Sequence, residues 1–193
     1  ELEQIVVTAI PNAEPGAELL RPAAVLGGAE LEQRRTNTIG GTVAREAGVQ
    51  SGTFGPAVGR PIIRGLEGAR VQVLQSGVSS LDVSTVSADH AVTIEPFLAD
   101  QIEILKGPST LLFGSGAIGG VVNMVDGRIA EAPVEGFGGR AELHGNTVNN
   151  ERAGMVRLDA GNGAAAMHVD YVRRDGDDFD LPDGTLLNSA IDQ

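Results

Sequence analysis

The sequence contains no cysteine and no tryptophan, and its 193 residues include only one tyrosine and five phenylalanines. The absence of cysteine excludes a disulfide framework, a thiolate metal site and a cysteine nucleophile. Because aromatic side chains supply much of the apolar area of a protein core, so few of them argue against a large independent core.

Basic residues are also few, with 14 Lys and Arg against 26 Asp and Glu, which gives a formal net charge of −12 at pH 7. Such a charge argues against nucleic acid or anionic lipid headgroups as a main partner. No run approaches the roughly 18 consecutive apolar residues that a transmembrane helix needs.

Catalytic motifs are missing as well. The three histidines, His90, His144 and His168, are scattered along the chain, and neither GxSxG nor HExxH occurs. We therefore predict that the chain is not an enzyme.

Glycine is abundant, and the stretch from 101 to 125, QIEILKGPSTLLFGSGAIGGVVNMV, concentrates it. We expect strands over 102–105 and 121–125, with one or two helical turns over 109–113 between them. Pro108 suits the first turn of a helix, where its missing N–H costs nothing. The stretch thus predicts a compact α+β unit. The residues expected to shape its turns are Gly107, Pro108, Gly114, Gly116, Gly119 and Gly120.

Residues 114–119 match the dinucleotide-binding pattern GxGxxG letter for letter. That pattern needs a strand immediately before it and a long helix after it. Here a helical turn precedes the glycines and a β-branched run follows them. No Gly-Lys-Ser/Thr follows either, so we exclude both a nucleotide fold and a phosphate loop.

Two blocks of this sequence resemble the signature of the plug domain of TonB-dependent outer-membrane receptors. One block comprises DQIEILKGP at 100–108 and FGSGAIGGVVN at 113–123. The other is RGLEGARVQVL at 64–74, followed by SGV at 76–78. Two long motifs in the family's order and spacing are far more specific than one glycine pattern.

The resemblance implies an α+β plug domain over residues 29–127, a linker over 128–136, and the start of a transmembrane antiparallel β-barrel over 137–193. The last part includes an extracellular loop. Family barrels have about 22 strands, so this chain is expected to hold only the first of them. The resemblance then implies that this part of the chain contacts the remainder of its own barrel and the lipid of the outer membrane.

Three segments after residue 136 alternate apolar and polar residues with a period of two. They cover 139–147, 151–160 and 164–174. A length near ten residues with one apolar face fits strands of an outer-membrane barrel. The residues alone also allow an ordinary amphipathic antiparallel sheet.

The first ten residues carry a β-forming run, which by itself allows a short edge strand. The resemblance implies a TonB box over 1–10, which pairs main chain to main chain with the partner protein TonB. Residues 11–28, with three prolines and several glycines, indicate a linker. The box residues are Ile5, Val6, Val7, Thr8 and Ala9.

Three charged residues of the signature blocks are candidates for a contact between plug and barrel. Taken alone, Arg64, Asp100 and Glu103 indicate surface salt bridges of little energy. The resemblance implies that they form a lock released when TonB pulls. Asp100 stands where the family usually has glutamate, which shortens its reach.

Residues 79–94 form a long, weakly patterned segment, and a loop of this length inside a compact domain is usually functional. Asp89 and His90 offer a carboxylate and an imidazole, which suit zinc or another divalent metal, although solvated loop charge is the alternative. Asp82 and Glu95 are weaker candidates. The acidic run over 175–183 is expected on an extracellular loop, where it concentrates cations.

The string SADHAV at 87–92 also resembles plugs of zinc-uptake receptors. We therefore expect a receptor in the outer membrane of a Gram-negative bacterium that imports zinc or another divalent metal as its substrate and requires no cofactor. A ferric-siderophore or haem receptor is the alternative. A non-transporting binding or signalling module is a further one.

Overall fold

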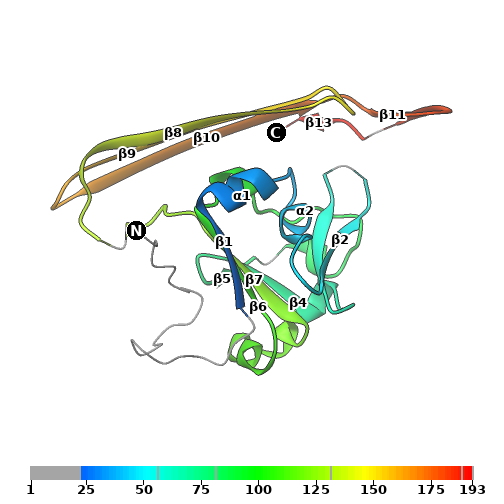
Figure 1. The fold of residues 1–193 in the computed structure, drawn as a ribbon, viewed down its shortest axis with the longest axis horizontal. Helices are drawn as coiled ribbons and strands as arrows, with labels where there is room; N and C mark the ends of the chain where they lie inside the picture. The colour runs from blue at the N-terminus through cyan, green and yellow to red at the C-terminus, as the bar shows by residue number, and fades with distance from the viewer. Residues whose placement is uncertain (1–22, 56, 81, 131, 188, 193) are drawn as a thin grey trace. The chain divides into compact units, whose positions relative to one another are not determined.

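The computed structural model describes residues 23–55, 57–80, 82–130, 132–187 and 189–192 (Figure 1). The predicted TonB box and residues 11–22 of the predicted linker lie outside the described residues. The chain divides into two compact units, the first ending at Asp126 and the second starting at Gly127.

The first unit is built on a five-stranded sheet of order β1-β6-β7-β4-β5 (Figure 1). β4 and β7 run parallel, and every other neighbouring pair is antiparallel. The strands are β1 (Ala23–Gly27), β4 (Val71–Gln75), β5 (Val78–Ser79), β6 (Gln101–Leu105) and β7 (Gly120–Val125).

Short helices and a hairpin complete this unit. Thr38 begins α2 as its N-cap, because its side chain accepts a hydrogen bond from the Gly41 amide at 3.1 Å. The helices are α1 (Gly28–Arg34), α2 (Ile39–Val43), η1 (Gly68–Arg70), η2 (Val83–Thr85), η3 (Pro96–Leu98), η4 (Pro108–Phe113) and η5 (Ser115–Ala117). The hairpin pairs β2 (Val49–Thr53) with β3 (Gly59–Ile63).

The core follows from the period-two alternation of β6 and β7. Ile102, Ile104, Val122 and Met124 are fully buried on one face, in a cluster with apolar residues of β1, α1, α2, β2 and β3. Leu105 and Val121 point to the opposite face of the sheet, where they are buried in a second cluster with Leu74 and Ala117. Burial on both faces explains why β7 is apolar at every position after Gly120 except Asn123.

The glycines of the signature stretch let the start of β7 pack closely. A Cβ at Gly119 would lie 2.8 Å from the Arg70 carbonyl oxygen, and one at Gly120 would lie 2.5 Å from a methyl of Ile63. β7 follows these glycines directly, without the long helix of a dinucleotide-binding unit. Gly119 and Gly120 therefore allow the chain to pack closely at the start of β7.

The predicted boundary between linker and plug is wrong. β1 lies inside the segment 11–28 that the sequence indicates as linker, and α1 already begins at Gly28. The physical reason is that Leu26 is 1% exposed and β1 pairs along its whole length with β6. The small residues of this segment do not form a strand pattern in the sequence, and the strand is stabilised by its pairing with β6.

The second unit is an antiparallel sheet of order β13-β10-β9-β8 beside a small hairpin. Its three long strands contain most of each predicted alternating segment and extend beyond several of the predicted ends. They are β8 (Glu135–Asn146), β9 (Glu151–Asn162) and β10 (Ala166–Gly176), and β13 (Ile191–Asp192) adds two residues. The hairpin pairs β11 (Phe179–Leu181) with β12 (Gly184–Leu186).

The register of β8, β9 and β10 separates apolar from polar side chains. Leu143 is 91% exposed and Tyr171 is 62% exposed, on the face they share with Val156 and Val169. The opposite face carries Arg140, Arg157, Asp159, His168 and Asp170. The described strands do not close into a barrel, and no described helix is long and apolar enough to cross a membrane.

Candidate functional site

The loop between β5 and β6 carries the four residues that the sequence suggests as metal ligands. Asp82 begins η2 as its N-cap, and one of its oxygens accepts hydrogen bonds from the Ser84 amide at 2.9 Å and from the Ser84 hydroxyl. The other oxygen accepts from the Ser80 hydroxyl at 2.6 Å and from the amide and hydroxyl of Thr93, both at 3.1 Å. This carboxylate therefore ties the two ends of the loop together.

Electrostatics agree with an anchoring role for Asp82. Partial burial raises the pKa of its carboxyl, but the hydrogen bonds from Ser80, Ser84 and Thr93 outweigh burial and lower the pKa below its ordinary value. Because both oxygens are occupied by donors of the loop itself, the geometry corrects the prediction of a metal ligand here. The residue is a structural anchor.

Glu95 has a similar local role at the other end of the loop. Its side chain caps η3 by accepting a hydrogen bond from the Phe97 amide at 3.0 Å. Among the described residues Glu95 does not join Asp89 and His90 in a group of three that could hold a metal ion.

Asp89 and His90 do lie together. The Nδ1 atom of His90 is 2.9 Å from a carboxylate oxygen of Asp89, and both side chains are about half exposed. The Ser87 hydroxyl donates to the same carboxylate and, with a smaller contribution from His90, lowers the pKa of Asp89 to about 2. The Nε2 atom of His90 has no partner among the described residues.

A carboxylate and an imidazole are two ligands of a metal site that usually has three or four. The described residues contain no group of three or more His, Cys, Asp or Glu side chains that could hold a metal ion. The pair can therefore coordinate a metal only if other ligands join it.

The carboxylates of the acidic run at the end of β10 and beyond it make hydrogen bonds within their own segment. Asp178 accepts hydrogen bonds from the Ser189 amide at 2.7 Å and the Ala190 amide at 2.8 Å. Asp180 accepts from the Thr185 hydroxyl at 3.3 Å, across the β11–β12 hairpin. These carboxylates hold their own loop.

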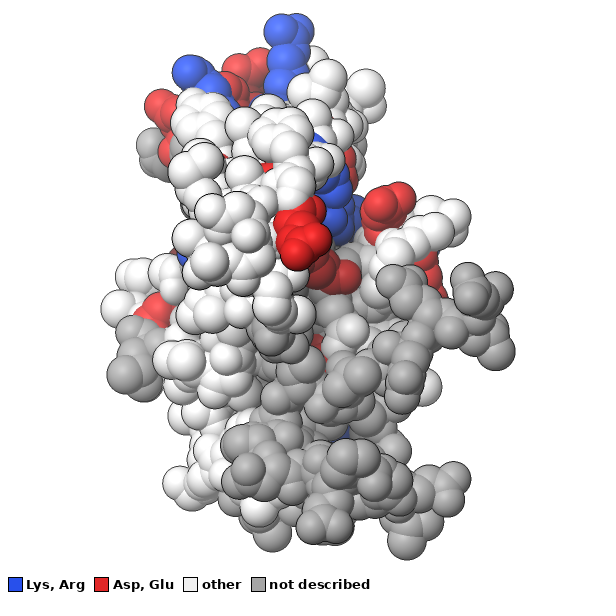
Figure 2. Space-filling model, turned by 90° about the vertical axis from the view of Figure 1, so that its left-hand side faces the viewer, with Lys and Arg blue, Asp and Glu red and all other residues white. Residues whose placement is uncertain are grey.

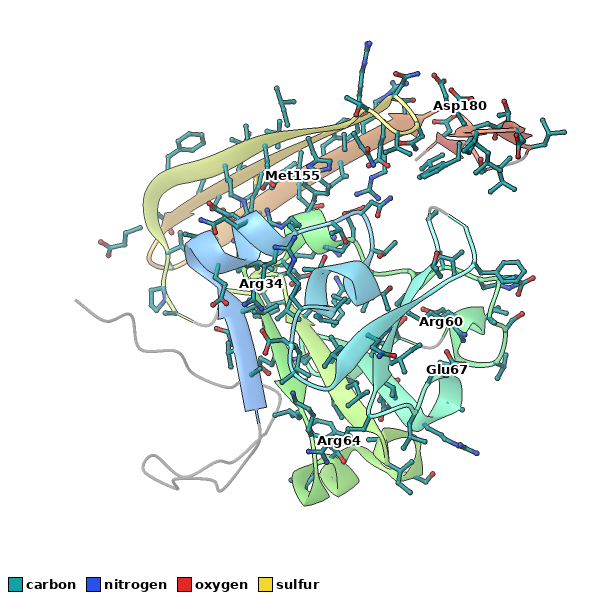
Figure 3. The ribbon with its side chains drawn as sticks, turned by 45° about the vertical axis from the view of Figure 1, so that its right-hand side comes forward. Arg34, Arg60, Arg64, Glu67, Met155 and Asp180 are labelled. Atoms are coloured by element: carbon teal, nitrogen blue, oxygen red, sulfur yellow. The ribbon has the colours of Figure 1, made fainter. Side chains whose placement is uncertain are left out.

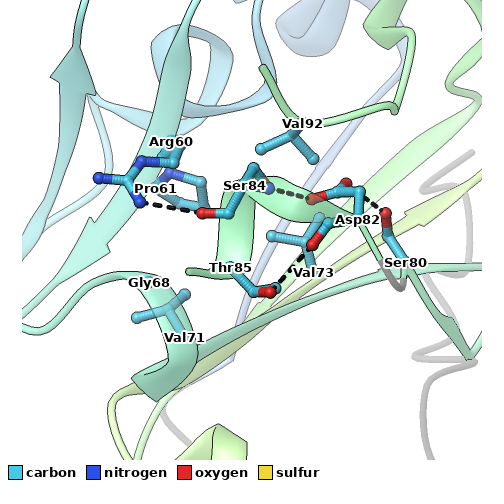
Figure 4. A pocket seen from close by; sticks show the side chains of 10 residues that line it. All are labelled: Arg60, Pro61, Gly68, Val71, Val73, Ser80, Asp82, Ser84, Thr85 and Val92. Carbon is cyan, nitrogen blue, oxygen red and sulfur yellow. Dashed lines mark hydrogen bonds between the residues drawn. The ribbon is translucent and has the colours of Figure 1, made fainter. Parts of the chain in front are cut away.

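An arginine that belongs to none of the predicted sites supports the loop. Arg60 is 9% exposed, and its guanidinium donates to the Ser84 carbonyl at 2.9 Å (Figure 4). The guanidinium also lies 3.4 Å from a carboxylate oxygen of Glu67. The cavity there has a volume of about 20 Å³, which holds roughly one water molecule. The signal was an arginine directly before the apolar run at 61–63.

The three predicted lock residues occupy different places. Arg64 follows β3 with a φ of 52°, and its amide donates to the Gly48 carbonyl at 2.9 Å. Figure 3 shows it away from the pair of Arg60 and Glu67. Within the described part of the chain Arg64 has no ion pair with Asp100 or Glu103.

Glu103 is 0% exposed in the middle of β6. Its two oxygens accept hydrogen bonds from the side-chain amides of Gln101 at 2.8 Å and Asn123 at 3.0 Å. Asn123 in turn accepts from the Gly77 amide at 2.9 Å. The carboxylate thus joins β6 and β7 inside the plug, while Asp100 lies at the entrance of β6, where its amide donates to the Val125 carbonyl.

Figure 2 presents one face, on which acidic and basic side chains are interspersed and most of the described surface is uncharged. A basic stripe of the kind that follows a nucleic-acid backbone is not present on this face.

Comparison with known proteins identifies the class. The family model described as "TonB-dependent Receptor Plug Domain" matches residues 16–121, which is more than half of the chain. The chain therefore belongs to the family of TonB-dependent receptors with a plug domain. Members of this family are receptors and transporters, which agrees with the prediction that the chain is not an enzyme.

Several solved structures of TonB-dependent receptors have a similar fold. "Copper transporter OprC" matches with a TM-score of 0.67 and 23% identity, covering 84% of this chain and 25% of that one. The ferric enterobactin receptor PfeA of Pseudomonas aeruginosa matches with a TM-score of 0.65 and 15% identity, covering 83% of this chain and 25% of that one. The hemophore receptor HasR of Serratia marcescens matches with a TM-score of 0.72 and 16% identity, covering 88% of this chain and 27% of that one.

This chain thus spans about a quarter of the length of these structures. At these identities the similarity shows the fold, and the predicted fold class of a plug followed by antiparallel strands is confirmed. The names of these three structures mention copper, enterobactin and haem respectively, so the comparisons do not single out one substrate.

Proposed function

We propose that the protein to which this chain belongs is an outer-membrane receptor of a Gram-negative bacterium that imports a divalent metal ion, zinc in the first place. TonB drives the import by pairing with Ile5–Ala9. The observation that carries the choice of substrate is the exposed pair of Asp89 and His90 on the long plug loop.

The chemistry of this pair suits a borderline divalent cation. Asp89 is ionised in the physiological range, and the hydrogen bonds from Ser87 and His90 lower its pKa further, to about 2. A neutral imidazole beside a carboxylate is a common partial ligand set for zinc and copper. The similarity in fold to a copper transporter supports a free metal ion as a substrate class.

The remaining ligands must come from parts of the receptor beyond this pair. Two ligands bind a metal weakly, and a barrel loop that adds one or two more raises the affinity steeply. The receptor would then bind its ion tightly only when plug and barrel loops are brought together.

The test is calorimetric titration of the full-length receptor with Zn²⁺, and in parallel with Cu²⁺. We expect the His90→Ala and Asp89→Ala variants to weaken zinc binding by about tenfold or more, as loss of one metal ligand does. His144→Ala serves as the matched control, because it removes a histidine from the second unit and leaves the loop intact.

Unchanged zinc and copper affinity in both loop variants would contradict the metal assignment. The candidate would then be a ferric siderophore, whose uptake can be measured with the same variants. Family membership would stand in either case, because it rests on the plug domain and not on the loop.

A further inference from the structure

The apolar face of the sheet in the second unit carries two arginines at one end. On β10, Tyr171 is followed on this face by Arg173, and Arg152 lies on the same face of the neighbouring strand β9. Both arginines are exposed. Because a long basic side chain at the end of a lipid-facing apolar surface extends toward the headgroups, we expect both guanidinium groups at headgroup level.

One glycine is the neighbour of both arginines on this face. Gly154 stands opposite Arg173 in the register of β9 and β10 and lies two residues from Arg152 along β9. On its other side it stands opposite Leu143 of β8. Among the described residues, a Cβ at Gly154 would meet a methyl of Leu143 at 3.4 Å and no arginine atom within 4 Å. The surface above this glycine is therefore open to a small group.

The two arginines have hydrogen-bond donors to offer such a group. Nε of Arg173 is held 2.8 Å from one oxygen of Asp175, and a terminal nitrogen is 3.1 Å from the other. A guanidinium has five N–H groups, so this contact fixes its position and leaves donors for a further acceptor. Arg152 has no hydrogen-bond or ion-pair partner within the described part of the chain.

The carboxylates at this end lie toward the other edge of the sheet. Asp175 stands opposite Arg152 on β10, and Asp192 of β13 stands opposite Asp175. In the strand order β13-β10-β9-β8, Gly154 of β9 is further from Asp192 than either arginine's partner Asp175 is. Because the chain carries a formal net charge of −12, an anion finds a favourable place only beside basic groups such as these.

We propose that Arg152 and Arg173 bind the phosphate group of a membrane lipid above Gly154, while the acyl chains of that lipid lie along Leu143 and Tyr171. The proposal rests on the proposed location in the outer membrane. A phosphate accepts parallel hydrogen bonds from a guanidinium, which favours arginine at phosphate sites. The exposed apolar side chains beside the arginines favour a lipid over free phosphate, because they bind chains and not water.

The experiment measures lipid binding to the full-length receptor in a detergent micelle. Phosphatidylglycerol is titrated in, and native mass spectrometry counts the bound lipid. We expect the double variant Arg152→Gln, Arg173→Gln to weaken this binding by about tenfold or more, as loss of charge-assisted hydrogen bonds does. A double variant of Arg45→Gln and Arg70→Gln, two exposed arginines of the plug, makes the same charge change and should leave the affinity unaltered.

Two further probes separate the phosphate from the chains. Diacylglycerol with the same acyl chains has no phosphate, and inorganic phosphate has no chains. We expect neither of them, at the concentration of the phosphatidylglycerol, to displace it. Added salt should weaken phosphatidylglycerol binding in the unchanged receptor, because it screens exposed charges, and should have little effect in the Arg152, Arg173 double variant.

Equal affinity for phosphatidylglycerol in that double variant and in the unchanged receptor would overturn the proposal. So would diacylglycerol that binds as tightly as phosphatidylglycerol. Displacement by inorganic phosphate would overturn the choice of a lipid. A full-length receptor that stays dispersed without detergent would instead contradict the outer-membrane location, so the two failures are distinguishable.

Discussion

At the scale of single residues, the long plug loop uses similar side chains for two purposes. Asp82 accepts hydrogen bonds from Ser80, Ser84 and Thr93 and holds the loop. Asp89 accepts from Ser87 and faces His90 at the exposed end. A carboxylate surrounded by donors of its own loop is an anchor, and one beside an imidazole with a free nitrogen can bind a ligand.

The two roles predict opposite effects of removing each carboxylate. Asp82→Ala should lower the free energy of opening of the loop by about 1–3 kcal/mol, because the amide and hydroxyl of buried Ser84 lose their acceptor. Asp89→Ala should leave that free energy unchanged within about 0.5 kcal/mol and weaken metal binding instead. Hydrogen exchange of the amides from 83 to 93 in the full-length receptor measures the opening. Equal exchange in both variants would contradict the distinction.

The lowered pKa of Asp82 predicts a pH dependence with a definite sign. Because the folded pKa lies below the ordinary value of 3.8, the stabilising contribution is fully present above pH 3.8 and is lost as the pH falls through the folded pKa. Exchange protection of the loop, corrected for intrinsic rates, should therefore be flat from neutral pH down to 3.8 and fall only below it. In Asp82→Ala this acid transition should disappear.

At the scale of elements, β1 joins the plug sheet through β6 and contributes Leu26 to the core. Leu26→Ala should lower the free energy of unfolding of the plug by about 2–5 kcal/mol, as truncation of a buried leucine does. Hydrogen exchange of the β6 backbone amides in the full-length receptor measures this change in the free energy of unfolding. The control is Val78→Ala on the exposed edge strand β5. This variant should change the free energy of unfolding of the plug by less than about 0.5 kcal/mol. Equal protection of β6 in both variants would show that β1 is not part of the core.

The elements also show what sequence patterns can and cannot reveal. β6, β7 and the three long strands of the second unit were predictable, because apolar runs and period-two alternation determine their burial. β1 was not, since its small residues become a strand only beside β6. The Asp82 cap has a local signature, a carboxylate two residues before Ser84. The contact of His168 with Asp159 has none, because it depends on the register of β9 and β10.

At the scale of the whole molecule, the expected link to TonB lies in a segment outside the described residues. Val7→Pro removes a main-chain donor and fixes φ, which is incompatible with pairing as an added strand. The variant should lose both capture by TonB and uptake of the substrate, while binding of the substrate from outside stays intact. Normal uptake by Val7→Pro would contradict the assignment of the box.

We expect that the second unit is not a free-standing domain in water, because one face of its sheet is apolar and exposed. Phe137, Leu143 and Tyr171 are each more than 60% exposed, and a sheet of few strands with an open edge pairs with other chains. The 193-residue chain alone should therefore aggregate in plain buffer and disperse in detergent. Replacing Leu143, Val169 and Tyr171 together by serine should reduce both the aggregation and the need for detergent. Light scattering measures this, and a dispersed monomer of the unchanged chain in buffer would contradict the membrane-facing role of this surface.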